Sequence, residues 1–187
     1  MELSNLIEKR RAYRSLEPVS VDRDLVSDLA GSAVLSPSCF NNQPWRYVFV
    51  YEKGRLEELF GALSAGNVWA QRASLIVAVA SKEEYDCRIK KRDYYLFDTG
   101  MATAFMILRA TDLGLVAHPI AGYDEQKVKQ VLRIPDSLTV ITLLIMGKHA
   151  GRIDPGLSEK QAAWEAERPE RLGEEKFVYH NEYNKEE

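Results

Sequence analysis

Residues 36–45, Ser-Pro-Ser-Cys-Phe-Asn-Asn-Gln-Pro-Trp, form the most distinctive stretch of the sequence. Pro37 and Pro44 restrict the backbone near both ends, and hydroxyl and amide side chains lie between them. This composition predicts an irregular loop, which could line a polar ligand or simply form internal Asx turns. Within it, Cys39 is predicted to be a small packing residue rather than a nucleophile, because no histidine lies near it in sequence.

The segments outside this loop predict helices and strands without a regular βαβ order. Ser20 or Asp22 is expected to cap the helix that contains residues 25–33, and Asp124 the helix over residues 124–132. Pro135 is expected to end this second helix, and Gly147 to close the strand over residues 138–146. Apolar spacing predicts helices over residues 3–7, 25–33, 56–63, 92–114 and 124–132. Strands are expected over residues 47–51, 75–80 and 138–146.

Length and composition indicate one domain with a substantial core. The chain has 187 residues, of which 45% are hydrophobic and 28% charged. Its net charge of −3 argues against nucleic-acid binding, and its apolar stretches are too short to span a membrane. Residues 1–5 lack the pattern of a secretory signal. Cys39 and Cys87 fit a reduced compartment and cannot form a zinc site by themselves, so a cytoplasmic protein without a metal site is expected.

Residues 151–187 differ in character from the rest of the chain. They carry ten acidic and six basic side chains, whereas residues 1–150 carry 18 and 19. Phe177, Tyr179 and Tyr183 are separated by even numbers of residues in this polar segment, as expected for an extended arm with one buried side. The arm is predicted to lie on a surface of this chain or of a partner.

Several common motifs are missing from the sequence. There is no G-x-G-x-x-G turn and no G-x-S-x-G elbow, and Asn67 stands where a phosphate-binding P-loop needs lysine. The histidines, His118, His149 and His180, are scattered and do not form a metal-binding pair. Backbone binding of a dinucleotide, serine hydrolysis and metal catalysis are therefore disfavoured.

Two further features have polar or cationic character. Arg10, Arg11 and Arg14 are predicted to stack at the end of the first helix, where they could bind a phosphate or form a solvated helix end. Residues 118–124, His-Pro-Ile-Ala-Gly-Tyr-Asp, are predicted to form a turn that leads into a helix. Its free backbone N–H groups could face a ligand, although such turns are common in proteins without one.

In this order, the motifs at 10–14, 36–45 and 119–124 resemble those of the FMN-dependent nitroreductase family. Residues 168–172 and 177–180 are similar to the family's C-terminal end, so the resemblance covers nearly the whole chain. The S-P-S-x-x-N-x-Q-P-W element is its most specific part. Ala12 and Cys39 stand where the family often has Ser, and Ala121 where it often has Glu or another residue, so contacts there are expected from the main chain or not at all.

The resemblance implies an α+β fold, with a central, largely antiparallel sheet wrapped by helices and an extended C-terminal arm. It implies a homodimer with two FMN sites at the subunit interface. Residues 1–150 would form the FMN-binding domain. Residues 151–187 would complete that domain and pack on the partner subunit.

The family motifs assign roles to the basic residues. Arg10 and Arg11 match positions that hold the phosphate and ribityl end of FMN, and Arg14 matches a basic position beside the pyrimidine edge of the ring. Arg171 matches a phosphate-binding arginine, with Arg168 as the reserve. Further alternatives for this contact are Lys148 and Arg152.

The remaining matches concern loops and turns. Ser38 and Asn41 match loop residues that reach the flavin of the partner subunit, and Pro37 and Gln43 belong to the same cofactor-binding loop. Asn67 matches an amide at the pyrimidine edge. The turn whose backbone faces flavin N5 corresponds to Ala121 and Gly122.

The implied activity is hydride transfer from NAD(P)H through flavin N5 to nitroaromatic, quinone or related acceptors by a ping-pong cycle. Arg14 would act in catalysis by stabilising the negative charge of the reduced ring, and no acid–base residue is assigned. The alternatives are a family variant that carries out dehalogenation or enone reduction, a flavin storage or sensor protein, and a structural domain that binds a generic anion.

Overall fold

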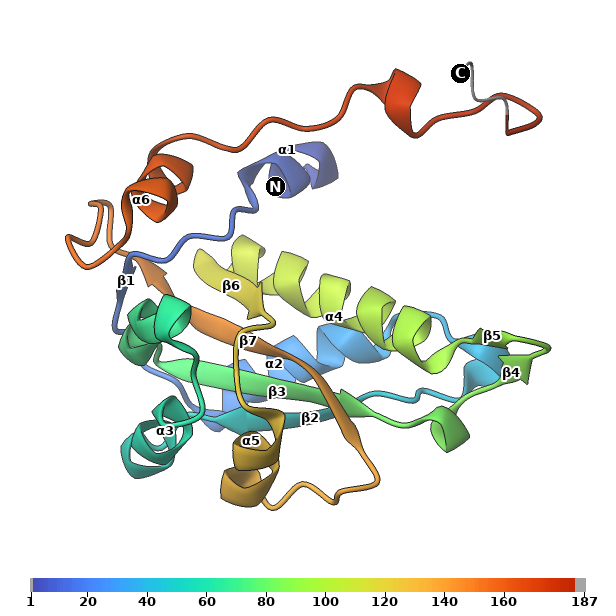
Figure 1. Ribbon diagram of the computed structural model, residues 1–187, viewed down its shortest axis with the longest axis horizontal. Helices are drawn as coiled ribbons and strands as arrows, with labels where there is room; N and C mark the ends of the chain where they lie inside the picture. Colours follow the sequence, from blue (N-terminus) through green and yellow to red (C-terminus); the bar gives the residue numbers. More distant parts are fainter. Residues whose placement is uncertain (1, 184–187) are drawn as a thin grey trace.

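The computed structural model describes residues 2–183 and has three layers, with one antiparallel sheet between two layers of helices (Figure 1). Every strand pairing in this sheet is antiparallel, which confirms the expected α+β architecture. The strands follow the order β1-β7-β3-β2, and β6 pairs with the other edge of β7. Their bounds are β1 Leu16–Glu17, β2 Arg46–Val50, β3 Leu75–Ser81, β6 Leu115–Ile120 and β7 Thr139–His149.

The central strand β3 is buried along its whole length and divides the core into two halves. Ile76 and Ala78 belong to one hydrophobic cluster, and Leu75 and Val77 to the other, because successive side chains of a strand point to opposite faces. The first cluster lies under α3 (Lys53–Phe60) and α5 (Glu125–Leu132), and the second under α2 (Arg23–Val34) and α4 (Tyr95–Asp112).

The helix predictions from local signals are confirmed for α2 and α5. Asp22 caps α2 by accepting from the backbone N–H of Leu25, and Asp124 caps α5 by accepting from that of Lys127. The long central helix α4 starts later than predicted, at Tyr95. The residues before it form a small hairpin, in which β4 (Arg88–Ile89) pairs with β5 (Arg92–Asp93).

Two expectations about strands and turns are wrong. His118, Pro119 and Ile120 are not part of a turn but form the end of β6, paired with β7. Proline is tolerated there because β6 is an edge strand, and the missing N–H costs no hydrogen bond in the ladder. Strand β7 does not close at Gly147 but runs on to His149, where it pairs with β1.

The C-terminal segment begins with a helix that apolar spacing did not reveal, α6 (Glu159–Ala166). Ser158 and Gln161 form a capping box at its start. Beyond α6 the chain runs past α1 (Leu3–Lys9) and away from the sheet (Figure 1). The aromatic side chains of Phe177 and Tyr183 are exposed, so within this chain they do not form the buried side expected of the arm.

The prediction that this arm packs on a partner is not tested by a single chain. Residues 184–187, which belong to the same segment, lie outside the described residues. Within residues 2–183, no helix combines the length and the apolar character that crossing a membrane requires.

Candidate functional site

The arginine-rich segment 10–14 is extended rather than helical, so the predicted stacking of Arg10 and Arg14 on a helix is wrong. Helix α1 ends at Lys9, and Arg10 has extended backbone angles. The segment passes beside α6, where the guanidinium group of Arg11 donates to the carbonyl oxygens of Trp164 at 2.9 Å and Glu165 at 3.2 Å. These contacts to a distant segment explain why local helical spacing was misleading.

Arg168 binds the same segment from the C-terminal side. Its guanidinium group donates to the carbonyl oxygen of Arg10 at 2.9 Å and also to that of Glu8. Arg171 lines the same pocket as Arg10, Arg11 and Arg168, which has a volume of about 110 Å³. The other proposed alternatives lie elsewhere, since Lys148 pairs with Glu17 and Arg152 lines a separate pocket.

Among residues 2–183, the guanidinium groups of this pocket have no acidic partner. In the described part of the chain, no carboxylate oxygen comes within 4.0 Å of a guanidinium nitrogen of Arg10, Arg11, Arg14, Arg168 or Arg171. Burial lowers the pKa of Arg10, and the charges of Arg168, Arg171 and Arg11 lower it further. The pocket therefore concentrates positive charge that no direct ion pair with a described acid neutralises.

Arg14 lies at the side of this pocket, between two indole rings. The carbon at the centre of its guanidinium group is 5.8 Å from the ring centre of Trp69 and 5.7 Å from that of Trp164. Both contacts are in the range of cation–π attraction, which fixes the position of the group without neutralising it. Burial lowers the pKa of Arg14, and the charge of Glu165 acts in the opposite direction.

Glu165 is a buried acid that the sequence analysis missed. Its carboxylate accepts hydrogen bonds from the backbone N–H groups of Arg14 at 2.8 Å and Ser15 at 3.0 Å. His149 Nε2 lies 3.3 Å from the same carboxylate. Glu165 therefore holds the arginine segment through its backbone and leaves the side chain of Arg14 available. Only the capping box of α6 could have indicated an ordered helix here.

Asn67 and Gly122, both predicted site residues, are in direct contact. Asn67 Nδ2 donates to the carbonyl oxygen of Gly122 at 2.9 Å, and Ser64 Oγ donates to the same oxygen at 2.9 Å. A Cβ atom on residue 122 would lie 2.5 Å from both donors, so the close approach requires glycine. Trp69 Nε1 donates to Asn67 Oδ1 at 3.3 Å, which connects this turn to the ring beside Arg14.

His118 connects β6 to the arginine segment. Its Nδ1 lies 3.1 Å from the carbonyl oxygen of Tyr13, which can only accept, so Nδ1 carries the proton of this hydrogen bond. The imidazole also packs against Trp69, with 4.7 Å between ring centres. Burial lowers the pKa of His118 to about 4, so the ring is neutral at pH 7.

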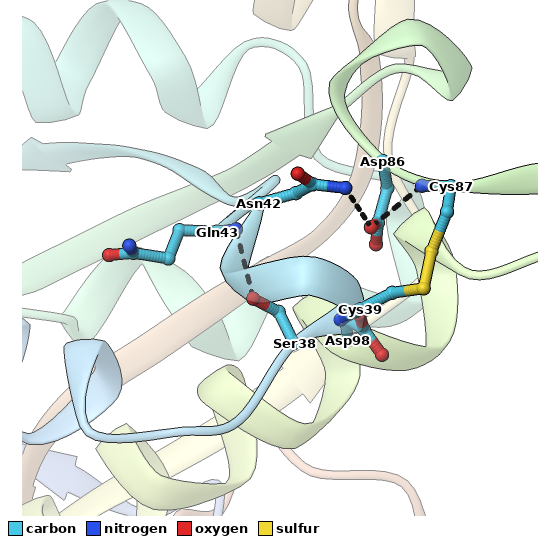
Figure 2. Close-up of a disulfide and its surroundings, with 7 residues drawn as sticks. All are labelled: Ser38, Cys39, Asn42, Gln43, Asp86, Cys87 and Asp98. Carbon is cyan, nitrogen blue, oxygen red and sulfur yellow. Dashed lines mark hydrogen bonds between the residues drawn. A yellow bond between two sulfur atoms is a disulfide. The ribbon is translucent and has the colours of Figure 1, made fainter.

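The loop 36–45 lies away from these residues. Ser38 Oγ accepts from the backbone N–H of Gln43 at 3.0 Å (Figure 2). Gln43 Nε2 donates to the carbonyl oxygen of Asn41 at 3.3 Å. Phe40, Asn41 and Gln43 have positive φ angles of 48°, 58° and 50°, and Pro37 is exposed. The loop is irregular as predicted and contains a short 3-10 turn at Cys39–Asn41.

The structure places this loop and the segment 10–14 at opposite ends of α4 (Figure 1). Asp98, in the first turn of α4, accepts from the backbone N–H of Cys39. At the other end of the helix, Thr111 and Arg11 line one pocket. An 18-residue helix is about 27 Å long, so one chain does not bring all the predicted site residues together.

The expectation that Cys39 is only a small packing residue is wrong. Cys39 and Cys87 form a disulfide that joins the loop to the segment before β4 (Figure 2). The two cysteines are 48 residues apart, and neither lies in a recognisable cysteine motif. No local pattern could have paired them.

Comparisons with known proteins agree with this architecture. The model of the nitroreductase family matches residues 7–88 and 57–148. A protein of Archaeoglobus fulgidus, whose name proposes an NADH dehydrogenase/NAD(P)H nitroreductase, is 24% identical over 152 residues, which is 78% of this chain and 84% of its own.

Two solved structures are similar along most of their length. A nitroreductase family protein from Clostridium novyi NT is 25% identical, with a TM-score of 0.74 over 86% of this chain and 98% of its own. A structure described as an oxidoreductase containing FMN is 22% identical, with a TM-score of 0.82 over 100% of this chain and 95% of its own. The chain therefore belongs to the nitroreductase family and has its fold, and the family assignment makes it an oxidoreductase.

Proposed function

We propose that this oxidoreductase is an FMN-dependent enzyme that uses NAD(P)H. The observation that carries the proposal is the pocket of Arg10, Arg11, Arg168 and Arg171, whose positive charges have no acidic partner among the described residues. Like charges held together in this way are unfavourable until an anion neutralises them. The phosphate of FMN carries about two negative charges at neutral pH and accepts forked hydrogen bonds from arginine.

The residues beside this pocket suit the ring of the same cofactor. Arg14 is positioned over Trp69 and carries a fixed positive charge, which would stabilise negative charge on a reduced ring at its pyrimidine edge. Asn67 and Ser64 hold the Gly122 turn through its carbonyl oxygen, and the absence of a side chain at Gly122 gives these two donors room to approach it, which fixes the backbone of Ala121 and Gly122 for a flat ligand.

When bound, FMN would supply the acceptance of hydride from NAD(P)H at its N5 atom and its delivery to a nitroaromatic, quinone or related acceptor. The chain's own residues bind and orient the cofactor and stabilise charge, and no side chain is assigned to acid–base work. The A. fulgidus relative carries NAD(P)H in its name, and the FMN-containing neighbour has the same fold. Both support this choice of donor and cofactor.

We also propose that the active form is a homodimer. The loop with Pro37, Ser38, Asn41 and Gln43 lies at the far end of α4 from the arginine pocket of its own chain. In a dimer, the loop of one protomer would complete the site of its partner. Phe177 and Tyr183 in 151–187 are exposed in one chain, which suits an arm that packs on the other subunit and completes the 1–150 domain.

The proposal is tested by FMN titration and initial-rate kinetics on the purified protein. We expect stoichiometric FMN binding, and parallel double-reciprocal lines when the NAD(P)H and quinone concentrations are varied, as a ping-pong cycle requires. Arg14→Leu should retain FMN but reduce it more slowly, whereas Arg23→Leu, an exposed residue of α2, should behave as wild type. A protein that takes up no FMN would contradict the proposal.

A further inference from the structure

The disulfide Cys39–Cys87 lies at a position where a thiol could reach it. Both cysteines are only half-buried, and the bond joins two segments that share no strand pairing, the 36–45 loop and the residues before β4 (Figure 2). Breaking it would therefore leave the sheet intact. Its chemical surroundings, rather than its role in the fold, distinguish it from an inert cross-link.

Two carboxyl groups lie beside the disulfide. Asp98 is 2% exposed and accepts a hydrogen bond of 2.6 Å from the backbone N–H of Cys39. Asp86 Oδ1 accepts from the backbone N–H of Cys87 at 2.8 Å and from Asn42 Nδ2 at 3.3 Å. One carboxylate oxygen of Asp86 and the two sulfur atoms all lie within 4.8 Å of one another. Each cysteine thus has an acid bonded to its own backbone N–H.

The two carboxyl groups interact with each other as well. Burial raises the pKa of Asp98, the hydrogen bond from the backbone N–H of Cys39 opposes this rise, and the hydrogen bond and charge of Asp86 add to it. Asp86 Oδ2 is buried and has no hydrogen-bond partner within residues 2–183. A proton shared by the two carboxyl groups would give this oxygen a partner. The pair is therefore suited to keep a proton close to the sulfur atoms at a pH where isolated carboxylates have lost theirs.

We propose that Cys39–Cys87 is a redox-active disulfide that exchanges with small dithiols, and that the Asp86–Asp98 pair supplies the proton for this exchange. A thiolate of the dithiol attacks one cysteine sulfur, the S–S bond breaks, and its electron pair goes to the other sulfur, which takes a proton from the carboxyl pair. The second thiolate of the dithiol then releases the first cysteine. The dithiol is oxidised to its disulfide, and both cysteines are reduced to thiols. The two protons that the dithiol loses equal the two protons that the cysteine thiols gain.

The exchange would also affect the cofactor site, and this part rests on the proposed function. Cys39 follows Ser38 and shares a 3-10 turn with Asn41, the two loop residues matched to the flavin of the partner subunit. Phe40, Asn41 and Gln43 hold positive φ angles, which side-chain-bearing residues adopt only when their surroundings enforce them. Reduction removes one of these constraints, so we expect the loop to relax and FMN to bind less tightly.

The exchange is tested on the full-length protein by thiol labelling after timed exposure to reduced dithiothreitol. We expect two labelled thiols after reduction, none after removal of the dithiol and reoxidation by oxidised glutathione, and reduction about a hundredfold slower in Asp98→Asn, which keeps an acceptor for Cys39 N–H but has no proton to give. Asp93→Asn, which removes the same charge from the neighbouring hairpin, should react as wild type. Asp86→Asn serves as the second variant if Asp98→Asn does not fold.

Two outcomes would overturn the exchange: cysteines that stay reduced in excess oxidised glutathione, or variants of both aspartates that are reduced at the wild-type rate. The effect on the cofactor is measured separately by FMN titration of the oxidised protein, the reduced protein and Cys87→Ser. We expect about tenfold weaker binding in the last two. Equal affinity in all three would overturn the link to the site. An absence of FMN binding in every form would refute the proposed function and leave the thiol result standing.

Discussion

The side chain of Asn67 donates a hydrogen bond of 2.9 Å to the carbonyl oxygen of Gly122, 55 residues further along the chain. This bond joins the 3-10 segment Ala65–Arg72 to the residues that follow β6. It also makes the turn part of one structural unit with Trp69 and Arg14, because Trp69 donates to Asn67 and lies against Arg14. The proposed ring-binding region is therefore built before any ligand arrives.

Gly122→Ala tests this close approach. Its Cβ would lie 2.5 Å from Asn67 Nδ2 and Ser64 Oγ, so these two side chains must move and both of their hydrogen bonds to the turn must weaken. We expect the free energy of unfolding to fall by about 1–3 kcal/mol, together with a loss of FMN affinity. Gly54→Ala in α3, where no atom lies within 4 Å of the new Cβ, should leave stability unchanged or raise it by up to about 1 kcal/mol. Equal effects of the two substitutions in urea denaturation would argue against the constraint.

Arg10→Gln tests the anion pocket. It removes one of several unneutralised charges, so the protein without ligand should lose little stability, and repulsion from Arg168 and Arg171 should decrease. FMN, in contrast, should bind about ten- to a hundredfold more weakly, because a charge-assisted hydrogen bond contributes about 1.5–3 kcal/mol. Fluorescence titration at two salt concentrations measures the affinity, and Arg23→Gln is the control. A large loss of stability with unchanged affinity would show a structural role instead.

Local signals in the sequence were sufficient for much of the fold. Asp22 and Asp124 stand directly before apolar stretches of helical spacing, and both cap helices as predicted. The family motifs singled out Arg10 and Gly122, but they did not predict the conformations or contacts of these residues. Contacts with α6 straighten the arginine segment, and this helix itself lies in a polar stretch with weak apolar periodicity.

The residues that sequence reasoning missed depend on contacts across long separations. Glu165 looks like any exposed helical acid until its bonds to Arg14 and Ser15 are known. Similarly, Asp98 occupies an ordinary position in the first turn of α4, where acids are common. The partners of both residues are fixed by the packing of whole elements, so no local pattern could reveal them.

His118 predicts a specific dependence of stability on pH. Its pKa falls from 6.5 to about 4 on folding, so the unfolded state takes up a proton more readily. The contribution of the neutral ring to the free energy of unfolding is complete above pH 6.5 and is lost as the pH falls from 6.5 to about 4. Between pH 7.5 and pH 5, wild type should lose about 2 kcal/mol from this residue, and His118→Gln should lack this loss. Parallel pH profiles of the two proteins in urea denaturation would contradict the assignment.

The shared site predicts complementation between two defective proteins. Arg14→Leu impairs the pocket, and the double variant Ser38→Ala/Asn41→Ala impairs the loop. When the two are unfolded together and refolded at equal concentrations, half of the dimers are mixed and each has one intact site. Activity should therefore recover to about a quarter of wild type. Arg14→Leu mixed with Arg10→Gln should show no recovery, because both changes affect the same pocket. Failure of the first mixture, with dimers present, would place the loop outside the site.

The most direct measurement is an absorbance spectrum of the FMN-reconstituted protein without oxygen, before and after addition of NADPH or NADH. The account predicts flavin bands in the protein fraction that bleach within seconds and return when a quinone or a nitroaromatic compound is added. Bands that persist with both nucleotides would contradict the proposed enzyme, and the chain would then bind the flavin without using it.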